Sequence, residues 1–253
     1  MKERTKRPIF VRQGVLRNIF WFPDFLQSWR TCVNFADVMK PEEILAEALR
    51  VVREGGTILY PTDTVWGLGC DATNAAAVAR IFEIKQRADS KSLVLLASDL
   101  DMVARFVKEI PSIAIDLVEV NDAPMTIIYP GAICSETGDK WHLAASCVAA
   151  DGTVGIRIPL DSASPETGAS KSAGPGHPTL WCKQLVFKLG RPLVSTSANI
   201  SGEPTPKRFS DIPQEIKDAV DFVVPPSVDT ASTGRASQIL KLGLSGEVEI
   251  IRK

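Results

Sequence analysis

The spacing of apolar residues along the chain predicts helices and short strands in alternation. From residue 41 to about residue 54, apolar side chains recur every three or four positions, after a proline and before Gly55-Gly56, which is typical of an amphipathic helix. Two more helices are predicted to follow the caps Asn74 and Asp99, and another spans about residues 180–189. Short apolar runs predict buried strands at residues 57–60, 93–97, 125–129, 153–158 and 192–196. The alternation indicates an α/β fold, with a twisted sheet flanked by helices.

Three further strands are predicted in the last part of the sequence, at residues 222–224, 238–240 and 248–251. Because these runs follow one another without a helical pattern between them, the sheet is expected to be mixed rather than purely parallel. Two segments interrupt the pattern, at residues 132–150 and 162–179. Both are expected to be surface insertions with little fixed structure, the second because it is rich in Ser, Gly, Pro and Ala.

The first forty residues differ from the rest in composition. Residues 1–40 carry eight Lys and Arg against three Asp and Glu, whereas the whole chain has 29 and 30, so the remainder is acidic. The apolar run at residues 19–26 is broken by Pro23 and Asp24 and does not have the long clean apolar region of a secretory signal. We therefore expect a mobile extension, or sequence foreign to the native protein, followed by one domain at residues 41–252.

Composition excludes several classes of protein. A chain of 253 residues that is 45% hydrophobic can bury a sizeable core. The sequence contains no run of eighteen apolar residues, so no membrane-spanning helix is predicted. The five cysteines are scattered without a CxxC pair, which argues against a disulfide framework and a zinc site and favours a reducing, cytoplasmic location. The acidic character of the domain argues against tight, nonspecific binding of nucleic acid, so any RNA contact is expected to be weak or indirect.

Familiar nucleotide and hydrolase motifs are absent from the sequence, namely GxxxxGK[ST], GxGxxG after a strand, and GxSxG. Three other segments carry candidate chemistry. In the first, residues 60–69, a predicted strand ends and is followed by Thr62, Asp63 and Thr64. Ligands of α/β proteins bind at such strand ends. The same residues also suit a plain turn, in which their side chains satisfy nearby backbone groups.

The second segment places Lys85, Arg87 and Lys91 at the predicted end of a helix and in the loop after it. Cations at this position often complement the helix dipole or stay solvated. The functional interpretation is that Lys85 and Arg87, one residue apart, turn together toward a polyphosphate.

The third segment, residues 194–202, is an apolar strand that ends in hydroxyl and amide side chains, among them Ser195, Ser197 and Asn199. These groups supply directional hydrogen bonds without net charge, which suits a neutral ligand or phosphate oxygens. A serine nucleophile is not favoured, because neither histidine of the chain has a context suited to a general base.

Together the three segments resemble the YrdC-like family of threonylcarbamoyl-AMP synthases, in its single-domain form. The family is marked by a KxR motif paired with a distant SxN motif, here Lys85-Gln86-Arg87 and Ser197-Ala198-Asn199. The likeness covers about residues 41–252 without the two insertions and includes the segments 61–69, 124–126, 155–159 and 191–193.

The resemblance implies an α/β fold with a large concave, electropositive cavity, and a reaction in two stages. The amine of L-threonine takes up bicarbonate as a carbamate, which attacks the α-phosphate of ATP and expels pyrophosphate. Mg²⁺ is expected with ATP, and the product is expected to pass to a tRNA threonylcarbamoyl transferase complex that forms t6A. Such chemistry needs alignment and charge stabilisation rather than an enzyme nucleophile.

Site residues follow from the same resemblance at the matching positions. Lys85 and Arg87 are the expected catalytic cations, and no metal is expected on protein ligands. L-threonine is expected at Thr62, Thr64, Arg157 and Ser195, and the nucleotide at Lys85, Arg87, Lys91, Thr126, Ser197, Asn199 and Arg235. The chain departs from the family pattern at Ala88 and Asp89, where proline is usual, and at Leu96, where some members have a histidine.

Two alternatives stay open. Relatives with this fold bind nucleotide or RNA without synthase activity, so the chain could be a binding module. A carbamoyl-transfer domain of the hydrogenase-maturation type is the other, but that function works beside zinc-finger segments and this chain has no CxxC.

Overall fold

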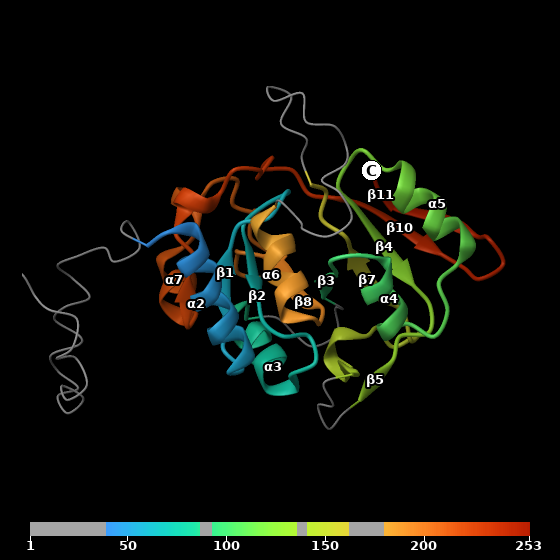
Figure 1. Ribbon diagram of the computed structural model, residues 1–253, viewed down its shortest axis with the longest axis horizontal. Coiled ribbons are helices and arrows are strands. Elements are labelled where there is room, and N and C mark those ends of the chain that lie inside the picture. Colours follow the sequence, from blue (N-terminus) through green and yellow to red (C-terminus); the bar gives the residue numbers. More distant parts are fainter. Residues whose placement is uncertain (1–38, 87–92, 136–140, 162–179) are drawn as a thin grey trace, which may run out of the picture. The chain divides into compact units, whose positions relative to one another are not determined.

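A computed structural model describes residues 39–86, 93–135, 141–161 and 180–253 (Figure 1). Residues 39–253 form one compact unit. The predicted extension before residue 39 and the predicted insertion at 162–179 lie outside the described residues, as do Arg87 and Lys91. No helix within the described ranges combines the length and the apolar character that a membrane span requires.

The helices of the described part are α2 (Pro41–Arg53), α3 (Ala75–Ile84), α4 (Leu100–Phe106), α5 (Ser112–Val120), α6 (Trp181–Leu189) and α7 (Gln214–Ala219). Of these, α2, α3, α4 and α6 lie close to the predicted positions. Both predicted caps are confirmed, because Asn74 accepts a hydrogen bond from the backbone of Ala77 and Asp99 accepts one from Met102. Gly190, with φ 73°, ends α6 in the left-handed conformation that glycine favours.

Nine strands form one sheet, in the spatial order β11-β10-β4-β7-β3-β8-β2-β1-β9. Their bounds are β1 (Ile58–Tyr60), β2 (Gly67–Gly69), β3 (Val94–Leu96), β4 (Met125–Tyr129), β7 (Val154–Arg157), β8 (Leu193–Ser197), β9 (Phe222–Val223), β10 (Gln238–Leu242) and β11 (Val248–Arg252). The pairs β1–β9, β3–β7 and β4–β10 are parallel and the other five are antiparallel. The mixed, twisted sheet predicted from the sequence is therefore confirmed.

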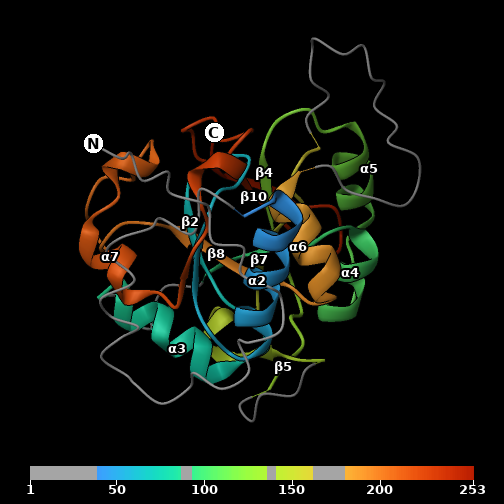
Figure 2. The same ribbon diagram turned by 60° about the vertical axis from the view of Figure 1, so that its left-hand side comes forward.

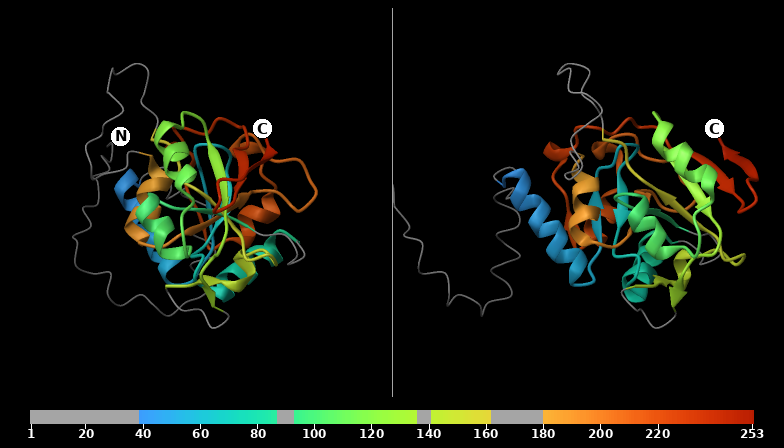
Figure 3. Two further views of the ribbon diagram at one scale, coloured as in Figure 1. Left: turned by 90° about the vertical axis from the view of Figure 1, so that its right-hand side faces the viewer. Right: turned by 45° about the vertical axis from the view of Figure 1, so that its right-hand side comes forward.

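Helices cover the sheet on two sides. Figures 2 and 3 show α2, α4, α5 and α6 along one side, and α3 and α7 on the other. Among these helices, α2 packs against α6. The apolar side chains between the layers form one buried cluster that runs from Ile44 in α2 to Leu242 in β10. The sheet and its helices therefore give the site a rigid support.

The prediction of a loosely structured insertion at residues 132–150 was wrong for its described part. Two short strands, β5 (Cys134–Ser135) and β6 (Leu143–Ala144), pair in parallel and are followed by a 3₁₀ turn at Ala145–Cys147. Leu143, Ala144 and Cys147 are fully buried, and the 3₁₀ turn packs against α3. The segment is therefore part of the core, although residues 136–140 lie outside the described part.

Besides β5 and β6, the sequence analysis missed α5, α7 and β2. The strand β2 is glycine at both ends, a composition that predicts a turn rather than a strand. Its glycines have a packing role, because the ring of Tyr60 lies over them from the neighbouring strand. A Cβ atom added at Gly69 would lie 2.6 Å from Cε1 of Tyr60 and 2.8 Å from the carbonyl oxygen of Val194.

We predict that Gly69→Ala destabilises the protein by about 1–3 kcal/mol, because the added methyl group meets a fully buried ring and a backbone oxygen that cannot both move away. Urea unfolding of the purified variant measures the loss. Gly155→Ala is the matched control in strand β7, since its Cβ would meet only ordinary contacts at 3.5 Å and beyond. Equal unfolding midpoints for the two variants would contradict the prediction.

Candidate functional site

The KxR and SxN segments, far apart in the sequence, are in direct contact. Lys85 follows the last turn of α3 and is 3% exposed. Its ammonium group donates hydrogen bonds to the carbonyl oxygens of Ser197, at 2.5 Å, and Asn199, at 2.8 Å, across 112 and 114 residues of sequence. The backbone oxygen of Lys85 in turn accepts a hydrogen bond from the amide of Ser201. The convergence expected from the sequence is therefore present.

The turn after β8 is ordered by its own side chains as well as by Lys85. Asn199 accepts a hydrogen bond from the Ser197 hydroxyl at 2.6 Å, and its amide group donates to the carbonyl oxygens of Ile200 and Glu203. Every polar atom of the Asn199 side chain is thus engaged. A hydroxyl and an amide fixed in this way present a preorganised surface for a polar ligand.

The chain leaves α3 in an unusual backbone conformation. Gln86, between the two cations of the KxR motif, has φ 49°, the left-handed region that residues other than glycine rarely adopt. This conformation ends the helix directly after Lys85. Arg87 and Lys91, which follow, lie outside the described residues, so their predicted roles stay predictions.

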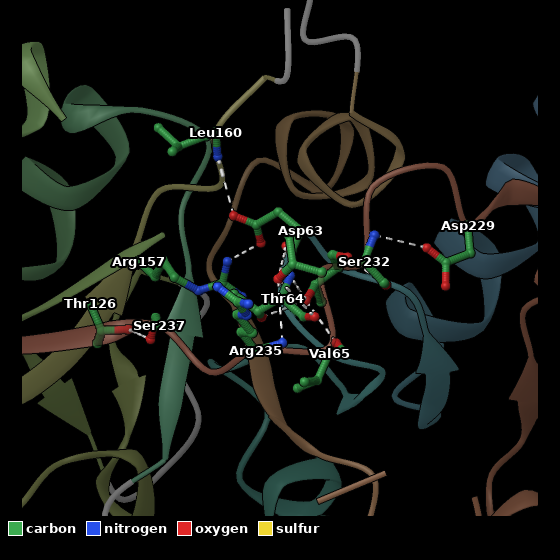
Figure 4. Close-up of polar contacts among 12 residues, drawn as sticks. Asp63, Thr64, Val65, Thr126, Arg157, Leu160, Asp229, Ser232, Arg235 and Ser237 are labelled. Atoms are coloured by element: carbon green, nitrogen blue, oxygen red, sulfur yellow. Dashed lines mark hydrogen bonds and ion pairs between the residues drawn. The ribbon is translucent and has the colours of Figure 1, made fainter. Parts of the chain in front are cut away.

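A second polar cluster forms around the loop after β1 (Figure 4). Asp63 and Arg157 make an ion pair in which both side chains are almost completely buried. The other terminal nitrogen of Arg157 donates to the hydroxyl of Thr64 at 3.2 Å, and that hydroxyl shares a hydrogen bond with Thr62 at 2.9 Å. Three residues that the sequence assigned to threonine binding, Thr62, Thr64 and Arg157, therefore lie together.

The loop before β10 binds the backbone of this cluster. The hydroxyl of Ser232 donates to the carbonyl oxygen of Thr62 at 2.8 Å, and the amide of Gly234 donates to that of Thr64 at 2.8 Å. The next residue, Arg235, is exposed and lies beside Thr64 in the close-up (Figure 4). The predicted nucleotide residue Arg235 is thus adjacent to the predicted threonine residues.

Ser237, which the sequence analysis did not single out, contacts a predicted site residue. It is 8% exposed and shares a hydrogen bond of 2.8 Å with Thr126, which is fully buried. Thr126 is also the direct strand partner of Arg157, so the two side chains lie on the same face of the sheet. Only the parallel pairing of β4 with β10 reveals Ser237, because a serine at the start of a strand carries no signal of its own in the sequence.

Ser195 lies near the start of β2. It pairs with Val94 in β3, and it lies two residues before Ser197 on the same face of β8. The ring of Tyr60 and the space above Gly67 lie next to it, since a Cβ added at Gly67 would meet the Ser195 hydroxyl at 3.5 Å. Ser195 therefore shares a face of β8 with Ser197 and lies beside Gly67.

The buried thiols of the site region are not nucleophiles. Burial raises the pKa of Cys182 to about 12 and that of Cys147 to about 12, and it raises the pKa of Cys70 well above its ordinary value. A thiol with such a pKa is neutral at physiological pH and unreactive. Within the described ranges, no group of three or more His, Cys, Asp or Glu is placed to hold a metal ion.

The structure also has a cavity of about 630 Å³ next to Asp63. Its lining includes Ile127 and Ile156, which point to the face of β4 and β7 opposite Thr126 and Arg157. Lys85, Ser197 and Asn199 are not among its lining residues. The cavity therefore adjoins the second polar cluster at Asp63, and the Lys85–Ser197–Asn199 group does not line it.

Sequence comparison identifies relatives over most of the chain. The profile of the Sua5/YciO/YrdC family, described as telomere recombination, matches residues 50–253. A threonylcarbamoyl-AMP synthase of Pseudoalteromonas translucida is 30% identical over 191 residues, which are 74% of this chain and 87% of that protein. One of Stenotrophomonas maltophilia is 31% identical over 186 residues, 72% of this chain and 86% of that protein.

Solved structures share the fold. E. coli YciO superposes with a TM-score of 0.61 at 22% identity, over 85% of this chain and 90% of its own. P. abyssi Sua5 in complex with L-threonine superposes with a TM-score of 0.59 at 24% identity, over 81% of this chain. The match spans 52% of that longer Sua5 chain. The profile match and the identity to these relatives show that the chain belongs to the Sua5/YciO/YrdC family.

Proposed function

We propose that the protein is an L-threonylcarbamoyl-adenylate synthase, which forms threonylcarbamoyl-AMP and pyrophosphate from L-threonine, bicarbonate and ATP. The observation that carries the proposal is the contact of Lys85 with the turn at Ser197 and Asn199. It joins two motifs that nucleotidyl transfer needs in one place, a cationic helix end and a set of directional hydrogen-bonding groups. The synthase names of the relatives in two bacteria support the same activity.

The nucleotide would bind where these two motifs meet. Lys85 fixes the position of the turn through two carbonyl oxygens, which leaves the hydroxyl of Ser197 beside a buried positive charge. Arg87 lies two residues further along the chain, and its planar guanidinium group suits the phosphate oxygens of ATP. Lys91, Thr126 and Arg235 are proposed as further nucleotide contacts.

L-threonine would bind at the second cluster. The guanidinium group of Arg157 attracts a carboxylate, and Asp63 keeps it in position through the buried ion pair. The hydroxyls of Thr62, Thr64 and Ser195 would recognise the polar groups of the amino acid. Threonine held in this way presents its carbamate to the α-phosphate, so that the enzyme contributes alignment rather than a covalent nucleophile.

Magnesium would arrive with ATP. The carboxylate of Asp63 is already paired with Arg157, and the described residues contain no group of three or more His, Cys, Asp or Glu that could hold a metal ion. Hydroxyl and amide groups around Ser197 suit phosphate oxygens better than a bare divalent cation. We therefore propose that the phosphates of ATP supply the metal ligands, and that Mg²⁺ neutralises charge on the pyrophosphate leaving group. The product would then serve t6A formation on tRNA through a transferase complex.

The experiment that tests the function is mass detection of threonylcarbamoyl-AMP after the purified full chain is mixed with its three substrates and Mg²⁺. Pyrophosphate release is followed in parallel. We expect release that depends on both L-threonine and bicarbonate. ATP binding without this double dependence would instead identify a nucleotide-binding module with the same fold.

Arg87→Ala is expected to lower kcat/KM by about 2–3 kcal/mol, or roughly 30- to 150-fold, because it removes a charged hydrogen bond to the phosphates. Steady-state kinetics with varied ATP measure the effect. Arg105→Ala is the control, since Arg105 is an exposed cation in the last turn of α4. Unchanged kinetics in Arg87→Ala would remove this residue from the proposed site.

Asp63→Asn is expected to cost about 3–5 kcal/mol of unfolding free energy, because it leaves the guanidinium group of Arg157 buried without its counter-charge. In the double variant Asp63→Asn, Arg157→Met, the apolar replacement removes this charge and most of the stability returns. Turnover does not return, since the double variant lacks Arg157, the residue proposed to bind the carboxylate of L-threonine. Chemical denaturation and the product assay are applied to the unmodified protein, the single variant and the double variant, and separate the effect on stability from the effect on turnover. An active double variant would assign Arg157 a purely structural role.

A further inference from the structure

We propose that the cavity beside α5 is a second binding site, for a small organic cation with an apolar body. This α5 cavity of about 630 Å³ lies between the C-terminal part of α5, the strands β4 and β7, and residues 158–161. This volume lies within the range that is usual for pockets that bind small molecules. The inference goes beyond the proposed synthase activity, because it concerns another ligand and, apart from Asp63 and Thr233 at the boundary, other residues.

Most of the α5 cavity lies on the face of the sheet opposite the proposed synthase site, and the two adjoin at Asp63 and Thr233. Side chains alternate between the two faces of a strand, and the cavity is lined by Met125, Ile127 and Tyr129 of β4 and by Ile156 of β7. Their neighbours Thr126 and Arg157 point to the opposite face and belong to the site already described. The two ligands would therefore occupy opposite sides of the same two strands.

The strand side of the cavity is apolar. Met125, Ile127 and Ile156 are each less than a tenth exposed and offer no hydrogen bond. The ring of Tyr129, which is 1% exposed, continues the same lining. This side of the cavity therefore suits an apolar body.

The entrance of the cavity is negatively charged. Glu119 and Asp122 lie at the end of α5, where the carbonyl groups of the helix already place partial negative charge, and the last turn has no basic residue. Neither carboxylate has an ion-pair partner in the described part of the chain. The one lysine of the lining, Lys183, is bound to Asp161 at 2.9 Å. A ligand with a protonated amine would relieve this concentration of negative charge, whereas an anion would be repelled.

Exposed apolar side chains continue from the entrance onto α5. Val120 is 76% exposed and Ile115 is 42% exposed, and of the nine residues of α5 only Ala114 is fully buried. A helix with so little buried surface has free apolar area next to the cavity. The amine would therefore lie near Glu119 and Asp122, and the apolar body would lie inside against Ile127 and Ile156.

The test uses the full chain and two probes of equal shape and opposite charge, tryptamine and indole-3-propionate. Binding is measured by calorimetry and by saturation-transfer NMR. We expect tryptamine to bind and indole-3-propionate to bind at least tenfold more weakly. Equal binding of both probes, or of neither, would overturn the proposal.

Two variants locate the bound probe. Glu119→Gln with Asp122→Asn keeps the shape and removes two charges, and we expect tryptamine affinity to fall by about tenfold. Val118→Trp fills the cavity from the helix side, and we expect it to abolish binding. Glu247→Gln with Glu249→Gln, on the β10–β11 hairpin, is the matched charge control and should leave affinity unchanged. Loss of affinity in this control, or undiminished binding in Val118→Trp, would contradict the assignment.

Competition separates the α5 cavity from the proposed synthase site. Saturating ATP and L-threonine should not displace tryptamine, and displacement would show that the probe occupies the synthase site instead. A variant in which a short Gly-Ser linker replaces residues 162–179 is the last arm. If tryptamine bound only to this variant, the cavity would be filled by the chain itself and the proposal would fail. The result holds whether or not the synthase assay is positive, so the two proposals fail independently.

Discussion

The arrangement of the site depends on one buried positive charge, the ammonium group of Lys85. An ammonium group removed from water is unstable unless acceptors surround it, and the carbonyl oxygens of Ser197 and Asn199 supply them. These acceptors lie more than a hundred residues away in the sequence and become available only when β8 is in place. The cationic helix end and the hydroxyl-rich turn are therefore fixed relative to each other by the energetics of folding, before any ligand binds.

The Asp63–Arg157 pair has the same character in the second cluster. It joins the loop after β1 to the end of β7, two strands that are separated in the sheet by β2, β8 and β3. The loop that carries Asp63 therefore reaches across the ends of these strands to Arg157. The contacts of Lys85 with the turn after β8 and of Asp63 with Arg157 bring residues from distant parts of the sequence together. Each contact fixes one of the two polar clusters in which the nucleotide and L-threonine are proposed to bind.

Local signals in the sequence predicted most of the elements, and failed where tertiary packing decides. Asn74 and Asp99 were recognisable as caps because a cap acts on the next three residues. Strand β2 was not recognisable as a strand, since Gly67 and Gly69 make room for the ring of Tyr60, and no local pattern reveals this neighbour. The segment at 132–150 looked like a loop, yet Leu143 and Cys147 are buried against α3. Among site residues, the family motifs gave Lys85, Arg157 and Asn199, whereas Ser237 depends on a parallel pairing across 111 residues.

The parallel pairing of β4 with β10 also determines when the sheet is completed during synthesis. Strand β10 enters the sheet beside β4, and the loop before it bonds the backbone of Thr62 and Thr64. When β1 to β9 have left the ribosome, the central strands are therefore present, but the edge of β4 still lacks its neighbour β10. The open edge of β4 would be exposed to chaperones or to mispairing until the final hairpin emerges.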